Sequence, residues 1–540
     1  MNYILNFLSI RRLKTNKIDD NDCFANCKPE HFNFDLISRY FYNTAKYKAN
    51  YHLITDKVKD DIDLDEVFRC IDRTSSKIGQ QFLYNKIRTI GTIEDLQKFE
   101  KLINIFESHP EKFNKTKEVL SRLNSDNSYY FEELIHGSQL EKPKWFILTY
   151  LFSGISMLFI VLSFFNPFFW VLLIGVFLVN FGFHYFNKSN LNYYLVAVSE
   201  FYKSIKIAKI LEKDSEIKSY FGDLSILTNI YKIKSKAQFI SFEKQLNSNE
   251  LYIIVWSIFE LLKILFNIEI ILFFRFIDDI IKEKENINNL FTLIGEIDAS
   301  ISVAKIRTEN LQICKPIFTE DKIIEIEKIT HPLIENCVSN SIKLNNRSLL
   351  LTGSNMSGKT TFIRIVSINS ILAQTINTCF AEEYKAPFFK IYSSIRTSDN
   401  LFENTSYFLE EVLTIKEFIS ASEKNEPCFF VLDEIFKGTN TAERISAGNS
   451  ILSYLNKRQH FVFVSTHDIE LTELLKHDNY ELYHFQEQII NNELIFDHKL
   501  KYGKLKTKNA IRILDLYNYP QEIITKANDT LSLFDYKREN

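Results

Sequence analysis

The stretch LTGSNMSGKTT, Leu351–Thr361, has the residue types and the spacing that hold a nucleotide phosphate. Gly353 and Gly358 bracket four residues. Lys359 and Thr360 follow them, which completes the pattern G-x-x-x-x-G-K-[ST]. We expect Lys359 to reach the β- and γ-phosphates of ATP and the Thr360 hydroxyl to bind Mg²⁺. The candidate nucleotide-binding residues of this loop are Gly353, Ser354, Asn355, Met356, Ser357, Gly358, Lys359, Thr360 and Thr361.

Two other apolar runs end in residues that suit phosphate hydrolysis. Cys428–Leu432 is a continuous apolar run, typical of a strand buried on both faces, and it ends in Asp433 and Glu434. Asp433 suits the Mg²⁺ shell, and Glu434 suits activation of the attacking water. Phe461–Ser465 is a second such run, and His467 follows it where it would sense the γ-phosphate. A purely structural role is the alternative for this histidine.

The surrounding elements must bring these residues to one place. Ser348–Thr352 reads as a buried strand, and the segment FIRIVSINSILAQ after the glycine loop reads as a helix. A strand, a glycine loop and a helix are typical of an open α/β sheet, whose ligands bind at the carboxyl ends of parallel strands. We therefore predict an α/β P-loop NTPase domain. Its catalytic candidates are Lys359, Glu434 and His467, and its metal-binding candidates are Thr360 and Asp433.

Several stretches of this half resemble, in order and spacing, the ATPase domain of the MutS family of DNA mismatch-repair proteins: TGSNMSGKTT, VLDEIFKGTNT and STHDIELTEL. LFENTSYFLEEV, Leu401–Val412, resembles the signature loop of that family. The resemblance implies that Ser406 reaches the nucleotide of a neighbouring subunit, so that a homodimer has composite ATP sites. Asn404 stands where many members have glycine.

The resemblance extends beyond the nucleotide motifs. THPLIEN, Thr330–Asn336, resembles the segment ahead of the P-loop, and HKLKYGKLKTKNAIRILDLYNYPQEIITKANDTL resembles the closing segment, although Lys-Asn-Ala replaces its usual Ser-Tyr-Gly. Ile62–Ile87 is similar to the start of the helical core of the family, and Leu293–Ile306 is similar to its last long helix. The resemblance implies Mg²⁺-dependent ATP hydrolysis, DNA binding and helical arms that move with the nucleotide state.

The mismatch-reading module of the family normally precedes the helical core. Only about sixty residues precede the core here, too few for that module and its connector. We therefore expect DNA binding without strong mismatch specificity. The net charge of −3 gives no global basic field that would attract nucleic acid. The seven cysteines are an odd number, which argues against a full disulfide framework and favours a reducing cytosol.

The middle of the chain contains a long uncharged segment. Trp145–Asn187 contains no Asp, Glu, Lys or Arg. Its two apolar parts, Trp145–Phe165 and Phe168–Phe186, are about 31 and 28 Å long as helices, close to the hydrocarbon thickness of a bilayer. Asn166-Pro167 between them is a turn signal. The lysines outside both ends, Lys142, Lys144 and Lys188, place both ends in the cytosol.

This pattern predicts a transmembrane hairpin that contacts the bilayer through residues 145–186. We accordingly expect a multi-pass protein of the cytoplasmic membrane, with its ATPase domain in the cytosol. The alternative is a buried helical pair in a soluble core. A second apolar stretch, Leu251–Phe276, is interrupted by four charged residues, and a charge at a bilayer centre costs about 2.5–3.5 kcal/mol. We expect a core or interface helix there.

These observations together predict a mixed fold: a C-terminal α/β P-loop domain and an all-α core that carries the hairpin. The predicted parts are residues 1–60, of unclear role; 61–140, the first part of a MutS-like helical core; 141–190, the transmembrane hairpin; 191–319, long helices that complete the core; and 320–540, the ATPase domain. The favoured function is a membrane-anchored ATPase linked to DNA mismatch repair or recombination. A membrane scaffold or remodelling ATPase without a nucleic-acid role is the alternative, and a transporter ATPase ranks third because one hairpin offers few helices for a transport path.

Overall fold

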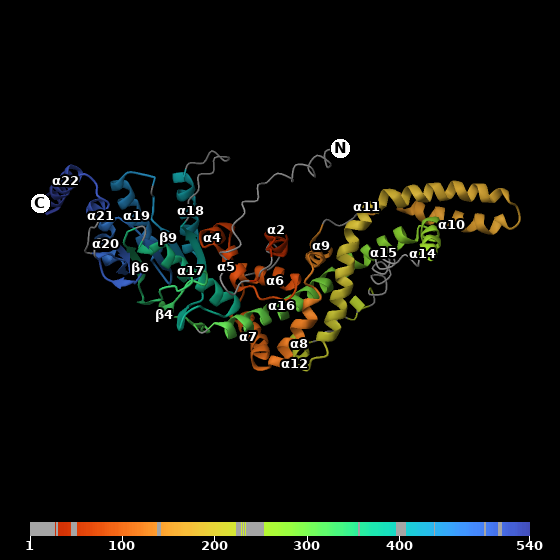
Figure 1. The fold of residues 1–540 in the computed structure, drawn as a ribbon, viewed down its shortest axis with the longest axis horizontal. Helices are drawn as coiled ribbons and strands as arrows, with labels where there is room; N and C mark the ends of the chain where they lie inside the picture. The colour runs from red at the N-terminus through yellow and green to blue at the C-terminus, as the bar shows by residue number, and fades with distance from the viewer. Residues whose placement is uncertain are drawn as a thin grey trace.

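The computed structural model of the 540-residue chain describes residues 28, 31–44, 51–137, 142–222, 228, 230–231, 233, 253–310, 312–354, 357–395, 407–436, 438–490, 493–505 and 510–539. They form a sheet-containing domain toward the C-terminus, a helical body, and a helical hairpin that projects from the body at the far end (Figure 1). The mixed helix and sheet fold predicted from the sequence is confirmed.

The C-terminal domain contains a six-stranded sheet with the strand order β14-β11-β6-β10-β9-β8. Five of these strands are parallel, and β14 pairs antiparallel at one edge. The strands, in that order, are Lys501–Tyr502, Tyr480–His484, Ser348–Thr352, Phe461–Ser465, Cys428–Asp433 and Lys390–Ser394. The parallel order places the carboxyl ends of β6, β10 and β9 side by side.

Helices cover both faces of this sheet, which explains why its strands are apolar without alternation. Successive side chains of β9 point to opposite faces: Phe429 packs in the core that includes α17 (Lys359–Ile376), and Phe430 packs in the core that includes α18 (Tyr407–Ser422) and α19 (Thr441–Leu455). Both phenylalanines are fully buried. The sheet therefore gives its carboxyl edge a rigid base.

Smaller sheets and helices complete the domain. One sheet has the order β3-β7-β4-β5, and β12 and β13 form an antiparallel pair. These strands are β3 (Ile317–Thr319), β4 (Ile323–Ile329), β5 (Asn340–Asn345), β7 (Glu383–Pro387), β12 (Glu487–Ile490) and β13 (Glu493–Phe496). The remaining helices are α20 (Ile469–Leu474), η5 (Leu475–His477), α21 (Ala510–Leu516) and α22 (Gln521–Glu539).

The helical body is organised around α16 (Lys284–Glu309), which packs against α6 (Lys77–Arg88) and α7 (Ile93–Ser108). The carboxylate of the buried Asp298 accepts hydrogen bonds from the Ser76 N–H and hydroxyl at 2.7 and 2.6 Å, which fixes the start of α6 against α16. Other elements of the body are α2 (Phe34–Ile37), α3 (Arg39–Thr44), β1 (His52–Leu53), α4 (Asp56–Asp61), α5 (Leu64–Ile71), β2 (Thr89–Ile90), α8 (Pro110–Ser121), η2 (Asp126–Tyr130), α9 (Phe131–His136) and α12 (Ser215–Phe221).

The projecting hairpin consists of α10 (Phe146–Ser163) and the first part of α11 (Phe168–Leu211). Within the described part of the chain, two helical segments are long and apolar enough to cross a membrane, Phe146–Ser163 and Phe168–Phe186. α11 continues well beyond the second segment and enters the body (Figure 1). The second predicted span ends at Phe186 because the apolar run ends there, whereas the helix itself continues without a break to Leu211.

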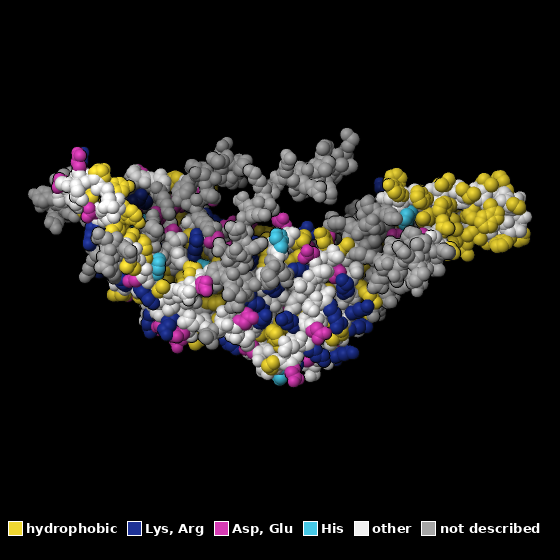
Figure 2. Space-filling model, in the orientation of Figure 1, with side chains coloured by type: hydrophobic (Ala, Val, Ile, Leu, Met, Phe, Trp, Pro, Cys, Tyr) yellow, Lys and Arg dark blue, Asp and Glu magenta, His cyan; other side chains and the backbone are white. Residues whose placement is uncertain are grey.

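Most side chains of the hairpin are not covered by the rest of the protein. Figure 2 shows hydrophobic side chains over most of the surface of the projecting hairpin. The apolar stretch Leu251–Phe276 contributes two helices, α14 (Ile253–Leu265) and α15 (Ile268–Lys282), rather than the single helix expected from the sequence. Asn267, with a left-handed φ of 48°, makes the turn between them.

Candidate functional site

The glycine loop joins β6 to α17, as the sequence predicts. Gly353 has φ 144° and Gly358 has φ 109°, both in the region that favours glycine. A Cβ atom on Gly353 would lie 2.7 Å from the carbonyl oxygen of Phe485, so the close approach of this backbone also requires glycine. Asn355 and Met356 lie outside the described residues.

The Lys359 ammonium lies inside the curve of the loop. Its side chain is only 1% exposed, and Nζ donates hydrogen bonds to the carbonyl oxygens of Gly353 at 2.8 Å and Ser354 at 3.0 Å. The same Nζ is 3.3 Å from Nε2 of His467. The charge is therefore held where a phosphate group in the loop would offer acceptor oxygens.

Thr360 and Asp433 meet at the carboxyl edge of the sheet. The Thr360 hydroxyl donates to Asp433 Oδ2 at 2.8 Å, and the Ser465 hydroxyl donates to the other carboxylate oxygen. The pairing of β9 with β10 sets Ser465 directly beside Asp433. A hydroxyl and a carboxylate in contact offer the hard oxygen ligands that Mg²⁺ prefers, so this donor set fits the metal.

Glu434 and His467 lie next to this oxygen pair. His467 Nε2 is 3.1 Å from Glu434 Oε1. Glu434 has a left-handed φ of 61°, and its N–H donates to the Ser465 carbonyl at 2.9 Å, which holds the turn after β9 against β10. Positive φ is uncommon for a residue with a side chain and clusters at functional sites.

A neighbouring ion pair supports the loop that carries His467. The Arg444 guanidinium, at the start of α19, donates to both carboxylate oxygens of Asp468, at 2.9 and 2.6 Å. The Asp468 carboxylate raises the pKa of Arg444 above its already high usual value. The motifs gave no signal for this pair, because its two residues become neighbours only when α19 packs beside β10.

A cavity of about 450 Å³ adjoins the glycine loop on the side of Gly358 and Thr361. Its lining is largely apolar, and His498 lies at its edge with Nδ1 donating to the Ser357 carbonyl at 3.2 Å. Lining residues that the sequence analysis did not single out include Ile334, Val338, Phe362, Ile365, Phe485 and His498. An apolar pocket next to a phosphate loop suits a flat aromatic base. The only signal for His498 was its place in the closing segment.

The segment ahead of the pocket is held by a neutral histidine. His331 Nδ1 accepts a hydrogen bond from the Leu333 N–H at 3.1 Å, so that nitrogen carries no proton. Burial, with a smaller effect from the nearby Arg364, lowers the pKa of His331 to about 4. This histidine therefore shapes the loop from which Ile334 reaches the cavity.

The structure thus brings together Gly353, Ser354, Ser357, Gly358, Lys359, Thr360, Thr361, Asp433, Glu434 and His467. Ser406 and the rest of residues 396–406 lie outside the described residues. Next to that segment, Glu411 of α18 accepts a hydrogen bond from the Phe436 N–H, a contact that the sequence analysis missed. It ties α18 to the turn that carries Glu434.

Comparison with known proteins places this region in a family. Residues 349–535 match the model of MutS domain V. The DNA mismatch repair protein MutS of Staphylococcus aureus strain MRSA252 is 30% identical over 275 residues, which cover 49% of this chain and 31% of that protein. The proteins of the same name from strains JH9 and Newman match with the same identity and coverage. The match therefore spans about a third of the length of these relatives.

Proposed function

Since this chain belongs to the MutS family, we propose that it binds ATP with Mg²⁺ and hydrolyses it at the carboxyl edge of its parallel sheet. The observation that carries the proposal is the meeting of the Lys359 ammonium, the Thr360–Asp433 oxygen pair and the Glu434–His467 pair around one loop. ATP is the expected nucleotide because the matched domain resembles an ATPase domain, and the apolar cavity beside the loop suits its flat base.

Each residue has a distinct role in this proposal. Lys359 exchanges the loop carbonyls for oxygens of the β- and γ-phosphates. Glu434 accepts a proton from the attacking water, and His467 orients the Glu434 carboxylate through its 3.1 Å contact. Thr360 and Asp433 hold Mg²⁺, which when bound neutralises charge on the phosphates.

Substitution of Glu434 by glutamine tests the hydrolytic role. The amide keeps the shape of the side chain but accepts a proton poorly, so phosphate release should slow at least tenfold while nucleotide affinity changes little. Phosphate release and binding of a fluorescent ATP analogue should be measured on the full chain in detergent. Glu320→Gln, at an exposed glutamate of the same domain, is the matched control. Unchanged turnover in Glu434→Gln would remove Glu434 from this role.

The hairpin supports membrane anchoring. In each of its two apolar segments only 22% of the 18-residue window is buried in the protein, whereas helices of a soluble core are mostly covered. Phe164, Phe165 and Phe186 are each more than 80% exposed. An apolar surface of this size favours a lipid environment over the soluble-core alternative. We propose that the hairpin crosses the cytoplasmic membrane and that the ATPase domain lies in the cytosol.

Family membership favours a role linked to DNA repair or recombination, and the hairpin favours the scaffold alternative. DNA binding by detergent-solubilised protein, with and without ATP, separates the two. Matched, mismatched and branched duplexes should be compared by fluorescence anisotropy at about 150 mM salt, because phosphate contacts depend strongly on salt. We expect binding with less than tenfold preference for the mismatch, since phosphate contacts do not read bases. Absence of binding to all three duplexes would favour the scaffold function.

A further inference from the structure

The turn between α14 and α15 docks on the side of the hairpin. The Ser153 hydroxyl of α10 donates to the carbonyl oxygen of Phe266 at 2.7 Å. The Asn180 side-chain amide of α11 donates to the carbonyl oxygen of Leu265 at 2.8 Å. Asn267 in turn donates to Asn180 Oδ1 at 2.8 Å. Polar side chains on both helices of the hairpin are therefore used to hold this turn.

The docking point lies well inside the apolar segments. Ser153 follows Phe146 by seven residues, and Asn180 precedes Phe186 by six residues. At 1.5 Å per residue, both lie about 10 Å from the end of the segment that is nearer to the body. The segments are about 27–29 Å long, and a bilayer hydrocarbon core is about 30 Å thick. A hairpin that spans a bilayer has no length to spare, so a turn docked at this depth enters the hydrocarbon layer.

The backbone at this turn is satisfied in the way that a hydrocarbon environment requires. The last carbonyl groups of a helix have no partner within the helix. The Leu265 and Phe266 carbonyls at the end of α14 accept their hydrogen bonds from the hairpin side chains described above. Irregular backbone is tolerated at membrane depth where protein groups satisfy it. Asn180 and Ser153 thus supply hydrogen-bond donors to carbonyl groups that water cannot reach in the hydrocarbon layer.

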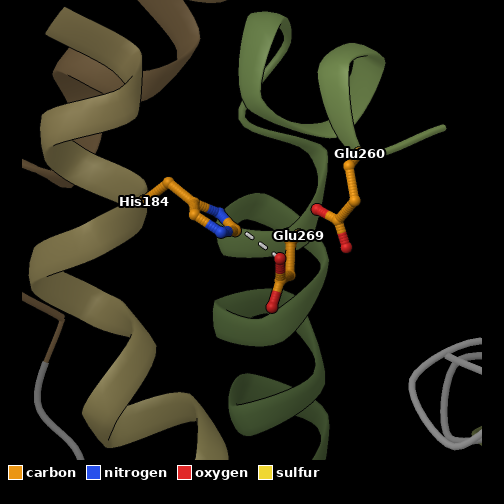
Figure 3. Close-up of side chains that lie close together, drawn as sticks. All are labelled: His184, Glu260 and Glu269. Atoms are coloured by element: carbon orange, nitrogen blue, oxygen red, sulfur yellow. Dashed lines mark ion pairs between the residues drawn. The ribbon is translucent and has the colours of Figure 1, made fainter. Parts of the chain in front are cut away.

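Three of the four charges that interrupt this stretch in the sequence, Glu260, Lys263 and Glu269, lie close together in the structure. Figure 3 shows Glu260 and Glu269 beside His184 of α11. Lys263 Nζ is 2.8 Å from Glu260 Oε1 and 3.9 Å from Glu269 Oε2, and His184 Nδ1 of α11 is 3.4 Å from Glu269 Oε2. Lys263 is 1% exposed. Charged groups in membrane segments face the protein interior and pair with one another. His184, Glu260 and Glu269 also have the donor types of a metal site; because the Lys263 ammonium supplies the positive charge, we assign no metal to them.

The outer face of α14 is apolar. Ile258, Leu261 and Leu262 are exposed and recur at i, i+3 and i+4, which forms one stripe along the helix. Nearer to the body, Arg275 Nε donates to the Tyr150 hydroxyl at 3.2 Å, and Lys142 pairs with Asp278. Cationic and tyrosine side chains are typical of the headgroup level of a membrane protein. The order along the hairpin is therefore polar at its base and apolar farther out.

We propose that α14 and α15 form a re-entrant helical pair, which enters the cytosolic leaflet beside the hairpin and presents Ile258, Leu261 and Leu262 to lipid acyl chains. This inference rests on the proposed transmembrane hairpin. It replaces the expectation that the four charges of Leu251–Phe276 exclude a membrane contact, because three of those charges are paired beside the hairpin. Among the described residues, this proposal gives two membrane elements, the hairpin that crosses and the helical pair that enters one leaflet.

Quenching of a site-specific fluorophore by lipids tests the proposal. Single cysteines at Ile258 and Leu261, in a background with all seven native cysteines replaced, are labelled with an environment-sensitive dye. The protein is reconstituted in phosphatidylcholine vesicles with and without nitroxides on the acyl chains. Ile174 on the exposed face of the hairpin and Tyr502 on the ATPase domain serve as lipid and water references. We expect quenching at Ile258 and Leu261 at least threefold above that at Tyr502.

The outcomes separate the two proposals. Quenching at Ile174 but not at Ile258 and Leu261 overturns the re-entrant pair and leaves the hairpin in place. Quenching at none of these positions overturns the hairpin as well. A blue-shifted but unquenched dye on α14 means that protein covers the stripe, which also overturns the proposal. Should the cysteine-free background lose ATPase activity, photo-crosslinking of the native chain with acyl-chain diazirine lipids gives the same decision from labelled α14 peptides.

Discussion

Single residues outside the nucleotide motifs hold the candidate catalytic side chains in place. Arg444 is the clearest case: its planar guanidinium binds both oxygens of Asp468, the residue after His467. His467 in turn contacts Glu434. Arg444 is therefore a positioning residue, which acts on the proposed hydrolytic step only through the loop that it holds.

Arg444→Met should lower kcat for ATP hydrolysis roughly fivefold, which corresponds to about 1 kcal/mol of transition-state stabilisation, with little change in KM. Arg444→Lys should fall between, because lysine keeps the charge but loses the two-pronged geometry. Arg458→Met, at a guanidinium that bonds the Glu423 carbonyl on the surface, is the control for steady-state kinetics. A rise in KM with unchanged kcat would show that Arg444 serves nucleotide binding instead.

The junction between the predicted segment of unclear role, residues 1–60, and the helical core contributes contacts to the large sheet, through β1 and α4. β1 and α4 lie along the edge strand β8 of the large sheet. His52 Nε2 donates to the Ile391 carbonyl at 2.7 Å, and the buried Asp61 accepts from the Ser393 hydroxyl at 2.6 Å and the Ile395 N–H at 3.1 Å. These contacts fix the end of β8, from which the chain continues toward the proposed signature loop.

The half-buried His52 and the buried His331 make the stability of these elements dependent on pH. Burial lowers the pKa of His52 to about 4, as it does for His331. The unfolded chain takes up protons on both side chains below about pH 6.5, whereas the folded chain does so only near pH 4. Their contribution to stability is therefore complete above pH 6.5 and decreases as the pH falls from 6.5 to 4.

We expect the midpoint temperature of thermal unfolding to be lower at pH 5.0 than at pH 7.5. In the double variant His52→Gln/His331→Asn the difference between the two pH values should be smaller. Glutamine retains a donor for Ile391, and asparagine retains an acceptor for Leu333, while neither titrates. The exposed His477→Asn is the control. An equal pH dependence in the double variant and the wild type would contradict this assignment.

Across the whole molecule, the nucleotide site and the hairpin are joined by a continuous series of helices (Figure 1). α17 begins at Lys359 and ends beside Asn377, whose carbonyl accepts from Arg307 of α16 at 2.8 Å. Arg307 also pairs with Glu100 of α7 at 2.8 Å. α16 then runs back through the body to α15, the helix that docks on the hairpin. The helices α17, α16 and α15 therefore form a packed route from the proposed nucleotide site to the hairpin.

Composite ATP sites make a prediction about mixed dimers. Lys359→Ala removes the phosphate contact within one subunit, and Ser406→Ala removes the contact proposed to come from the other. If Ser406 acts across the dimer, each mixed dimer has one intact site, which combines Lys359 of one subunit with Ser406 of the other. Each mixed dimer should then show about half of the ATPase activity of a wild-type dimer. ATPase assays of the mixture should be run after subunit exchange is shown by energy transfer between labelled subunits. No recovery after exchange would contradict sharing through Ser406.

Local sequence patterns sufficed for the features that depend on neighbours along the chain. The glycine loop, the acids after a buried strand and the charge-free helices are each defined within about ten to forty residues, since backbone geometry and burial act over that span. They led to the family, which the comparisons confirm, and to the mixed fold. The roles of the individual site residues stay predictions.

The remaining features were decided by the tertiary structure, because their partners are far apart in the sequence and no local period reports such contacts. Arg444 meets Asp468 only when α19 packs beside β10. His498 lines the apolar cavity beside the glycine loop, although it belongs to a segment about 140 residues farther along the chain. Each charge of α14 and α15 taken alone argues against a membrane contact. The pairing among Glu260, Lys263 and Glu269 removes that argument, since the cost of a buried charge depends on its neighbours as well as on its own residue type.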